Sequence, residues 1–212
     1  MNEIVDKKVK KCDIANLFTK NTKLILASNS ETRRRILQAS NIEFDIRPHK
    51  VDEEKIKKKD QMKTPENIVF EIAKAKALSQ ASTNKEEIII GSDQILVCDE
   101  KIISKAKTKD EAREKFRRLN NKKHKLISAI CIVKKRECIW EKISSAEVFL
   151  KKMTTKMINK YLEVNLKNAL ECVGGYKIEE DSMKLLTIHK GNLEDIQGFP
   201  ISEFITLYKK KK

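Results

Sequence analysis

The sequence has no apolar run that approaches the roughly 18 residues that a membrane-spanning helix needs, although 40% of its 212 residues are hydrophobic. Residues 1–11 are polar and charged and lack the apolar stretch of a secretory signal. We therefore expect a cytoplasmic protein with no membrane partner. The sequence also lacks internal repeats and any interior linker rich in Gly, Pro or Ser, so we expect one main folded domain.

Cysteine is scarce and scattered. There are five cysteines, no Cys-x-x-Cys pair occurs, and an odd number at irregular spacing argues against a disulfide framework. The three histidines lie far apart in the sequence, which disfavours a Cys/His zinc site. We expect reduced, mostly buried thiols at Cys12, Cys98, Cys131, Cys138 and Cys172.

Arginine is rare among the basic residues, with eight arginines in 46. The net charge of +15 still favours polyanionic partners such as nucleic acid, nucleotides or an anionic membrane. Lysine, however, is mainly a solubilising point charge, whereas arginine makes bidentate phosphate contacts. The chain also lacks a basic stretch interleaved with aromatic residues of the kind that stacks bases. A non-catalytic nucleic-acid-binding protein is therefore the alternative hypothesis rather than the preferred one.

Between the two ends, short apolar runs alternate with helical patterns, and a long antiparallel hairpin follows. This order predicts an α/β fold with a mixed, twisted sheet and flanking helices. Residues 1–22 are expected to form a flexible or loosely docked extension, residues 23–208 the folded domain, and residues 209–212 a basic tail. The expected strands are 23–27, 43–47, 88–90, 95–98, 101–103, 125–133, 138–150 and 185–189, and the expected helices are 31–39, 64–81, 108–119 and 154–164.

The first expected strand leads directly into an arginine-rich helix start at residues 28–35. Backbone N–H groups at a helix N-terminus bind anions, and the hydroxyls of Ser28 and Ser30 add donors. Arg33 or Arg34 can then hold a phosphate through two hydrogen bonds. Because basic residues in a first helical turn oppose the helix dipole, three together favour an anionic ligand. The alternative is that Ser30 only caps the helix and the arginines are solvated.

Asp93 follows a buried apolar strand and Gly91, which would place it at the carboxyl edge of a sheet, where α/β enzymes bind their ligands. A carboxylate there can hold a divalent cation or deprotonate a water molecule. The alternative is an aspartate that caps a turn. Residues 52–54 add carboxylates that could hold Mg²⁺ or Mn²⁺, although such a run is more often a charged loop.

Seven blocks occur in order over residues 23 to about 207: LILASNSETRRRIL, VDEEKI, IAKAKA, IIIGSDQILV, SKAKTKDEAREKFRRLNNKKHKLISA, ALECVGGYKIE and GFPIS. In this order they resemble the Maf (septum-formation) family of nucleoside triphosphate pyrophosphatases. Seven blocks in the same order make a chance match improbable.

The resemblance implies a mixed-sheet fold with a nucleotide cleft between two lobes, and leaves a homodimer open. It implies hydrolysis of a nucleoside triphosphate between the α and β phosphates, with a divalent cation such as Mg²⁺ or Mn²⁺. Asp93 matches the general base, and Glu53 an acidic position near the metal, so both are expected metal ligands. The positions that match the phosphate-binding residues are Ser28, Arg33, Lys76 and Lys105.

Three positions that track substrate preference in the family correspond here to Thr32, Gln94 and Glu179. Gln94 and Glu179 match the branch that acts on 7-methyl-GTP. Thr32 matches neither that branch nor the dTTP/UTP branch, and it removes the aromatic ring that would stack on a cationic base. The resemblance therefore lies closer to the 7-methyl-GTP branch, with the preferred base left open.

Overall fold

The computed structural model describes residues 22–58, 64–181 and 183–209. The expected N-terminal extension, apart from Thr22, and the last three residues of the expected basic tail lie outside the described residues.

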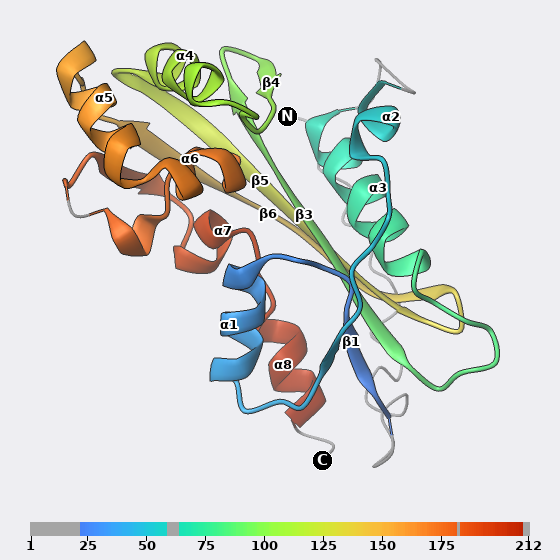
Figure 1. The fold of residues 1–212 in the computed structure, drawn as a ribbon. Helices are drawn as coiled ribbons and strands as arrows, with labels where there is room; N and C mark the ends of the chain where they lie inside the picture. Colours follow the sequence, from blue (N-terminus) through green and yellow to red (C-terminus); the bar gives the residue numbers. More distant parts are fainter. Residues whose placement is uncertain (1–21, 59–63, 182, 210–212) are drawn as a thin grey trace, which may run out of the picture.

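The centre of the fold is one seven-stranded mixed sheet, in which β2, β1 and β3 run parallel and the remaining pairings are antiparallel (Figure 1). The order across the sheet is β2-β1-β3-β5-β6-β7, and β4 pairs with β3. The predicted α/β class with a mixed sheet is confirmed. The strands are β1 (Leu24–Leu26), β2 (Asp45–Ile46), β3 (Ile88–Cys98), β4 (Lys101–Ile103), β5 (Lys122–Lys134), β6 (Glu137–Leu150) and β7 (Leu186–Lys190).

Helices cover both faces of the sheet, and three buried clusters form the core. One cluster lies between the sheet and α3; a second, on the other face, includes side chains from α1 and α8; the third lies at the far end of β5 and β6 beneath α4, α5 and α6 (Figure 1). The helices are α1 (Glu31–Ala39), α2 (Glu53–Lys58), α3 (Pro65–Leu78), α4 (Lys109–Leu119), α5 (Thr155–Val164), α6 (Leu166–Glu171), α7 (Leu193–Gln197) and α8 (Ser202–Lys209), with a 3₁₀ turn η2 (Ile178–Glu180).

The predicted helix starts are confirmed by their caps. Ser30, Thr64, Thr108 and Thr154 each accept a hydrogen bond from the backbone N–H three residues later. Such a cap satisfies a donor that the first helical turn would otherwise leave unpaired. None of the described helices combines the length and the apolar character needed to cross a membrane.

The prediction of two strands around Asp93 is wrong. Residues 88–98 form the single strand β3, which pairs with β5 along almost its whole length, so Asp93 lies in mid-strand. The parallel partner β1 ends at Leu26, opposite Ile90. Asp93 is therefore just beyond the carboxyl end of the parallel pairing, which is the position where α/β sheets bind ligands.

Glycine at position 91 allows α3 to approach the sheet closely. A Cβ atom there would lie 2.1 Å from the carbonyl oxygen of Ala73 and 2.6 Å from the backbone nitrogen of Ala77. Such contacts cannot be relieved by a side-chain rotation because both atoms belong to the helix backbone. This close packing fixes the position of α3, and hence of Lys76, against β3.

Candidate active site

A cavity of about 690 Å³ opens where β1 ends and β3 continues. Its walls come from the start of α1, the middle of α3 and β3, and the segment from α6 to η2. The nine site residues that the family resemblance indicated all line this one cavity: Ser28, Thr32, Arg33, Glu53, Lys76, Asp93, Gln94, Lys105 and Glu179. Of the carboxylates at residues 52–54, only Glu53 does so.

Arg33 is the buried member of the arginine cluster. Its Nη1 donates to the carbonyl oxygen of Ser92 at 2.8 Å and to Ser28 Oγ at 3.4 Å, and its Nε donates to the carbonyl oxygen of Gly198 at 3.4 Å. Burial lowers the pKa of Arg33, while the charges of Asp93 and Glu53 oppose that change. The guanidinium remains charged, because an arginine pKa starts far above neutrality.

The other two arginines of the cluster are exposed to solvent. Arg35 pairs with Glu31 at 2.7 Å on the exposed side of α1. The Arg34 side chain is 46% exposed at the rim of the cavity. Of the two candidates for holding a phosphate, Arg33 is therefore the one positioned inside the cavity.

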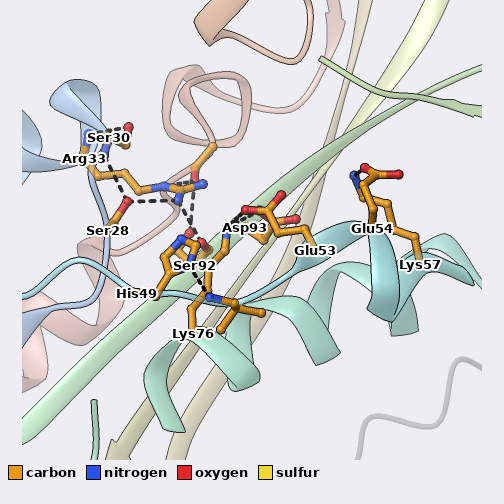
Figure 2. Close-up of polar contacts among 12 residues, drawn as sticks. Ser28, Ser30, Arg33, His49, Glu53, Glu54, Lys57, Lys76, Ser92 and Asp93 are labelled. Carbon is orange, nitrogen blue, oxygen red and sulfur yellow. Dashed lines mark hydrogen bonds and ion pairs between the residues drawn. The ribbon is translucent and has the colours of Figure 1, made fainter. Parts of the chain in front are cut away.

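Lys76 joins two carboxylates at the centre of the site. Its Nζ lies 2.7 Å from Asp93 Oδ1 and 2.6 Å from Glu53 Oε1. Figure 2 shows Arg33 reaching this group from α1, Glu53 from α2 and Lys76 from α3, with Asp93 between them. The Lys76 and Asp93 side chains are only 4% and 8% exposed, so their ion pair is shielded from solvent, whereas the Glu53 side chain is 31% exposed. Burial alone would raise the pKa of Glu53, but the hydrogen bond and charge of Lys76, together with the charges of Lys105 and Lys57, outweigh burial and lower the pKa.

Lys105 and His49 complete the polar lining around these groups. Lys105 follows β4, and the surrounding protein atoms together with the charge of Arg33 lower its pKa. Burial and the neighbouring Lys76 lower the pKa of His49, which favours its neutral form. Sequence reasoning did not single out His49, because one histidine after Pro48 carries no recognisable spacing.

The charges of the inner cavity suit a polyphosphate. Three cationic side chains, Arg33, Lys76 and Lys105, face two carboxylates, Asp93 and Glu53. Such a mixture can neutralise an anionic chain and still supply a carboxylate to accept a proton. The carboxylates also fit a divalent cation, because Mg²⁺ is typically held by one or two carboxylates together with substrate phosphates and water. Within the described part of the chain, no larger His, Cys, Asp or Glu cluster could hold a metal.

Gln94 has a fixed orientation beside this charged group. Its Nε2 donates to the carbonyl oxygens of Asp195 at 3.1 Å and Ile196 at 3.0 Å, and to Ser128 Oγ at 3.2 Å. A Cβ atom on Gly198 would lie 2.8 Å from Gln94 Cδ, so a glycine at 198 leaves room for this amide.

The opposite wall is the turn at residues 172–176. Tyr176 is buried, and its hydroxyl makes a short contact with His124 Nε2 from β5. Lys115 from α4 donates to the carbonyl oxygen of Val173 at 3.1 Å, and burial lowers its pKa to about 8. These contacts hold the wall against the third core cluster.

We expect His124→Gln to change how stability depends on pH. Burial lowers the His124 pKa from 6.5 to about 4, so the unfolded chain binds the proton more readily than the folded one. The free energy of unfolding that His124 contributes above pH 6.5 is on the order of 3 kcal/mol, and it is lost as the pH falls toward 4. Urea denaturation across this range should show a steeper loss for the wild type than for the variant. If the free energy of unfolding falls equally steeply with pH in both proteins, the lowered pKa of His124 is contradicted.

Comparison with known proteins identifies the chain. The family described as Maf-like protein matches residues 23–211. The chain belongs to the Maf-like family. A relative described as a nucleoside triphosphate pyrophosphatase, from Pelagibacter ubique, is 34% identical over 85% of this chain and 93% of its own length.

Two other relatives carry different substrate names. A 7-methyl-GTP pyrophosphatase from Rhizobium etli is 31% identical over 84% of this chain and 91% of its own length. A dTTP/UTP pyrophosphatase from Clostridioides difficile is 31% identical over 88% of this chain and 94% of its own length. The predicted Maf-like nucleoside triphosphate pyrophosphatase family, a family of hydrolases, is confirmed; the branch within it is not resolved by these relatives.

Proposed function

We propose that this Maf-like chain hydrolyses nucleoside triphosphates to a nucleoside monophosphate and pyrophosphate. The observation that carries the proposal is the convergence of Asp93, Glu53, Lys76 and Arg33 in one cavity, with Lys105 also lining it. The names of the related pyrophosphatases support the same reaction.

In the proposed reaction, Asp93 accepts a proton from water. The water oxygen bonds to the α phosphorus while the bond from that phosphorus to the oxygen bridging the α and β phosphates breaks. Pyrophosphate leaves with the electrons of the broken bond. Arg33, Lys76, Lys105 and Ser28 bind the phosphate oxygens and offset the charge that accumulates on them. Asp93 and Glu53 would hold the divalent cation, which when bound supplies further positive charge to the phosphates.

For the base, we propose a guanine nucleotide. Glu179 lies at the rim of the cavity and is exposed, where its carboxylate could accept hydrogen bonds from the N1–H and amino group of guanine. The same carboxylate would repel the carbonyl oxygens of a pyrimidine. Thr32 provides no ring to stack on a methylated base, so we do not expect 7-methyl-GTP to be preferred over GTP.

The test is a panel of GTP, 7-methyl-GTP, dTTP and UTP, each assayed for pyrophosphate and for orthophosphate with Mg²⁺ or Mn²⁺. Pyrophosphate as product, with GTP at least as good as 7-methyl-GTP and both better than the pyrimidine nucleotides, would support the proposal. Release of orthophosphate from the γ position would contradict the reaction. A preference for dTTP and UTP would contradict only the choice of base. Tight, steeply salt-dependent nucleic-acid binding without hydrolysis would instead support the alternative hypothesis.

A further inference from the structure

Two cysteines face each other across the β5–β6 hairpin, outside the residues that line the cavity. The Sγ atoms of Cys131 and Cys138 are 3.1 Å apart. This separation exceeds the S–S bond length of a disulfide by only about 1 Å. Both sulfurs belong to free thiols, and neither has a part in the reaction proposed above.

A β-bulge produces this juxtaposition. Up to Ile132 the register pairs Cys131 with Glu141 and Ile132 with Trp140, but Val133 pairs with Cys138. In a regular ladder Cys138 would lie opposite Lys134 and would point to the other face of the sheet, because side chains alternate. The extra residue of the bulge shifts it opposite Val133. Cys138 therefore shares a face with Cys131, beneath α3.

The two thiols are chemically unequal. Cys131 is fully buried, whereas Cys138 is partly exposed to solvent. The Cys131 S–H donates to the sulfur of Cys138, which lowers the pKa of Cys138 and raises that of Cys131. An accessible sulfur that ionises more readily, beside a second thiol within reach, is the arrangement found in redox-responsive cysteine pairs.

We propose that Cys131 and Cys138 form a redox modification site that closes to an intrachain disulfide when the chain meets a hydroperoxide. The Cys138 thiolate attacks the peroxide oxygen, the O–O bond breaks, and Cys138 becomes a sulfenic acid while water or an alcohol leaves. The Cys131 sulfur then displaces the sulfenic hydroxyl, which leaves as water. The two thiols give up two electrons and two protons in all, and a dithiol reductant reverses the change.

The site is adjacent to the catalytic strand but separate from the cavity. Cys131 pairs in register with Gly91, two residues before Asp93 on β3. The disulfide would therefore form under the part of α3 that packs on Gly91, without contact to bound nucleotide. The proposal does not depend on which substrate the cavity accepts.

The hairpin sequence provides a direct assay. Lys134, Lys135 and Arg136 lie between the two cysteines, so trypsin separates them into different peptides. We would treat the folded full-length chain with hydrogen peroxide, block the remaining thiols by alkylation, denature it, digest it and analyse the peptides by mass spectrometry. The expected result is a cross-linked pair of peptides, containing Cys131 and Cys138, that dithiothreitol splits.

Variants make the assay specific. Cys138→Ser and Cys131→Ser should lose the cross-linked pair, and in Cys131→Ser the Cys138 sulfur should accumulate as sulfinic acid because no partner thiol remains. Cys98→Ser and Cys172→Ser serve as matched controls and should retain it. The proposal is wrong if wild-type Cys138 is oxidised without joining Cys131, if another cysteine pair joins first, or if the cross-link forms only after denaturation. These wild-type outcomes decide the question even if a variant fails to fold.

Discussion

Asp93→Asn is expected to lower the turnover of nucleoside triphosphate by about 10²–10⁴-fold, the usual contribution of a positioned general base. The amide keeps the shape of the side chain but cannot accept the proton of water. It also weakens the carboxylate pair that would hold the divalent cation. Steady-state release of pyrophosphate at saturating Mg²⁺ measures the effect.

Stability measurements separate this chemical role from a structural one. In the variant, Lys76 keeps its ion pair with Glu53 at 2.6 Å, so no buried charge is left alone. We therefore expect a loss of unfolding free energy smaller than the about 3–5 kcal/mol of a fully broken buried pair. Asp181→Asn is the matched control, because Asp181 accepts the backbone N–H groups of Leu185 and Leu186 and does not line the cavity. It should cost stability while leaving turnover nearly intact.

A pH profile adds a second readout. If Asp93 is the base, pyrophosphate release should stay low across the whole pH range in the asparagine variant. Activity of Asp93→Asn within about tenfold of the wild type at every pH tested would exclude Asp93 as the base.

Local signals in the sequence were enough to predict most elements. The predicted helix 64–81 begins where Thr64 caps α3, and the predicted strands 125–133 and 138–150 form the β5–β6 hairpin. These features depend on capping groups, turn residues and periodicity within a few positions, which is the range over which sequence reasoning works.

The errors arose where distant contacts decide the structure. The polar residues Ser92 to Gln94 suggested a break after Ile90, but pairing with β5 continues the strand through them. The carboxylate run at residues 52–54 suggested a charged loop, yet Glu53–Lys58 form α2 beside α3. Tertiary context overrides local propensity in both cases.

The buried face of α3 is also set by a contact that is distant in the sequence. The fully buried residues of the helix include Val69, Ala73 and Ala77. The close approach of α3 at Gly91 selects the face with small residues. The same orientation of α3 also places Lys76 in the cavity. Without the family resemblance, the sequence offered no reason to separate Lys76 from the many other lysines.

The second large effect is expected for Lys76→Met, because Lys76 is the shared partner of two carboxylates. Its removal leaves Asp93 and Glu53 close together without their counter-ion in a poorly solvated place. Breaking a buried pair in this way costs about 3–5 kcal/mol of unfolding free energy. Loss of a cation from the proposed phosphate-binding residues should also reduce turnover by about 10²–10³-fold.

The stability loss should depend on pH in a defined direction. In the wild type the Glu53 pKa is lowered, so its contribution to stability is present above the unfolded value of 4.5 and is lost as the pH falls through the folded value. In the variant Glu53 loses the Lys76 charge that lowers its pKa, so the folded chain binds a proton at Glu53 more readily than the wild type does. The difference in stability between wild type and variant should therefore be largest near neutral pH and shrink as the solution becomes acidic.

Two further variants make the interpretation specific. Lys74→Met removes the same charge from the same helix two residues away, at a half-buried position outside the cavity, and should have a much smaller effect on both stability and turnover. Lys76→Met combined with Glu53→Gln removes the repulsion and should recover part of the lost stability without recovering activity, because the cation is still missing. If Lys76→Met were as stable as the wild type at neutral pH and equally active, the ion pairs at 2.6 and 2.7 Å would not organise the site.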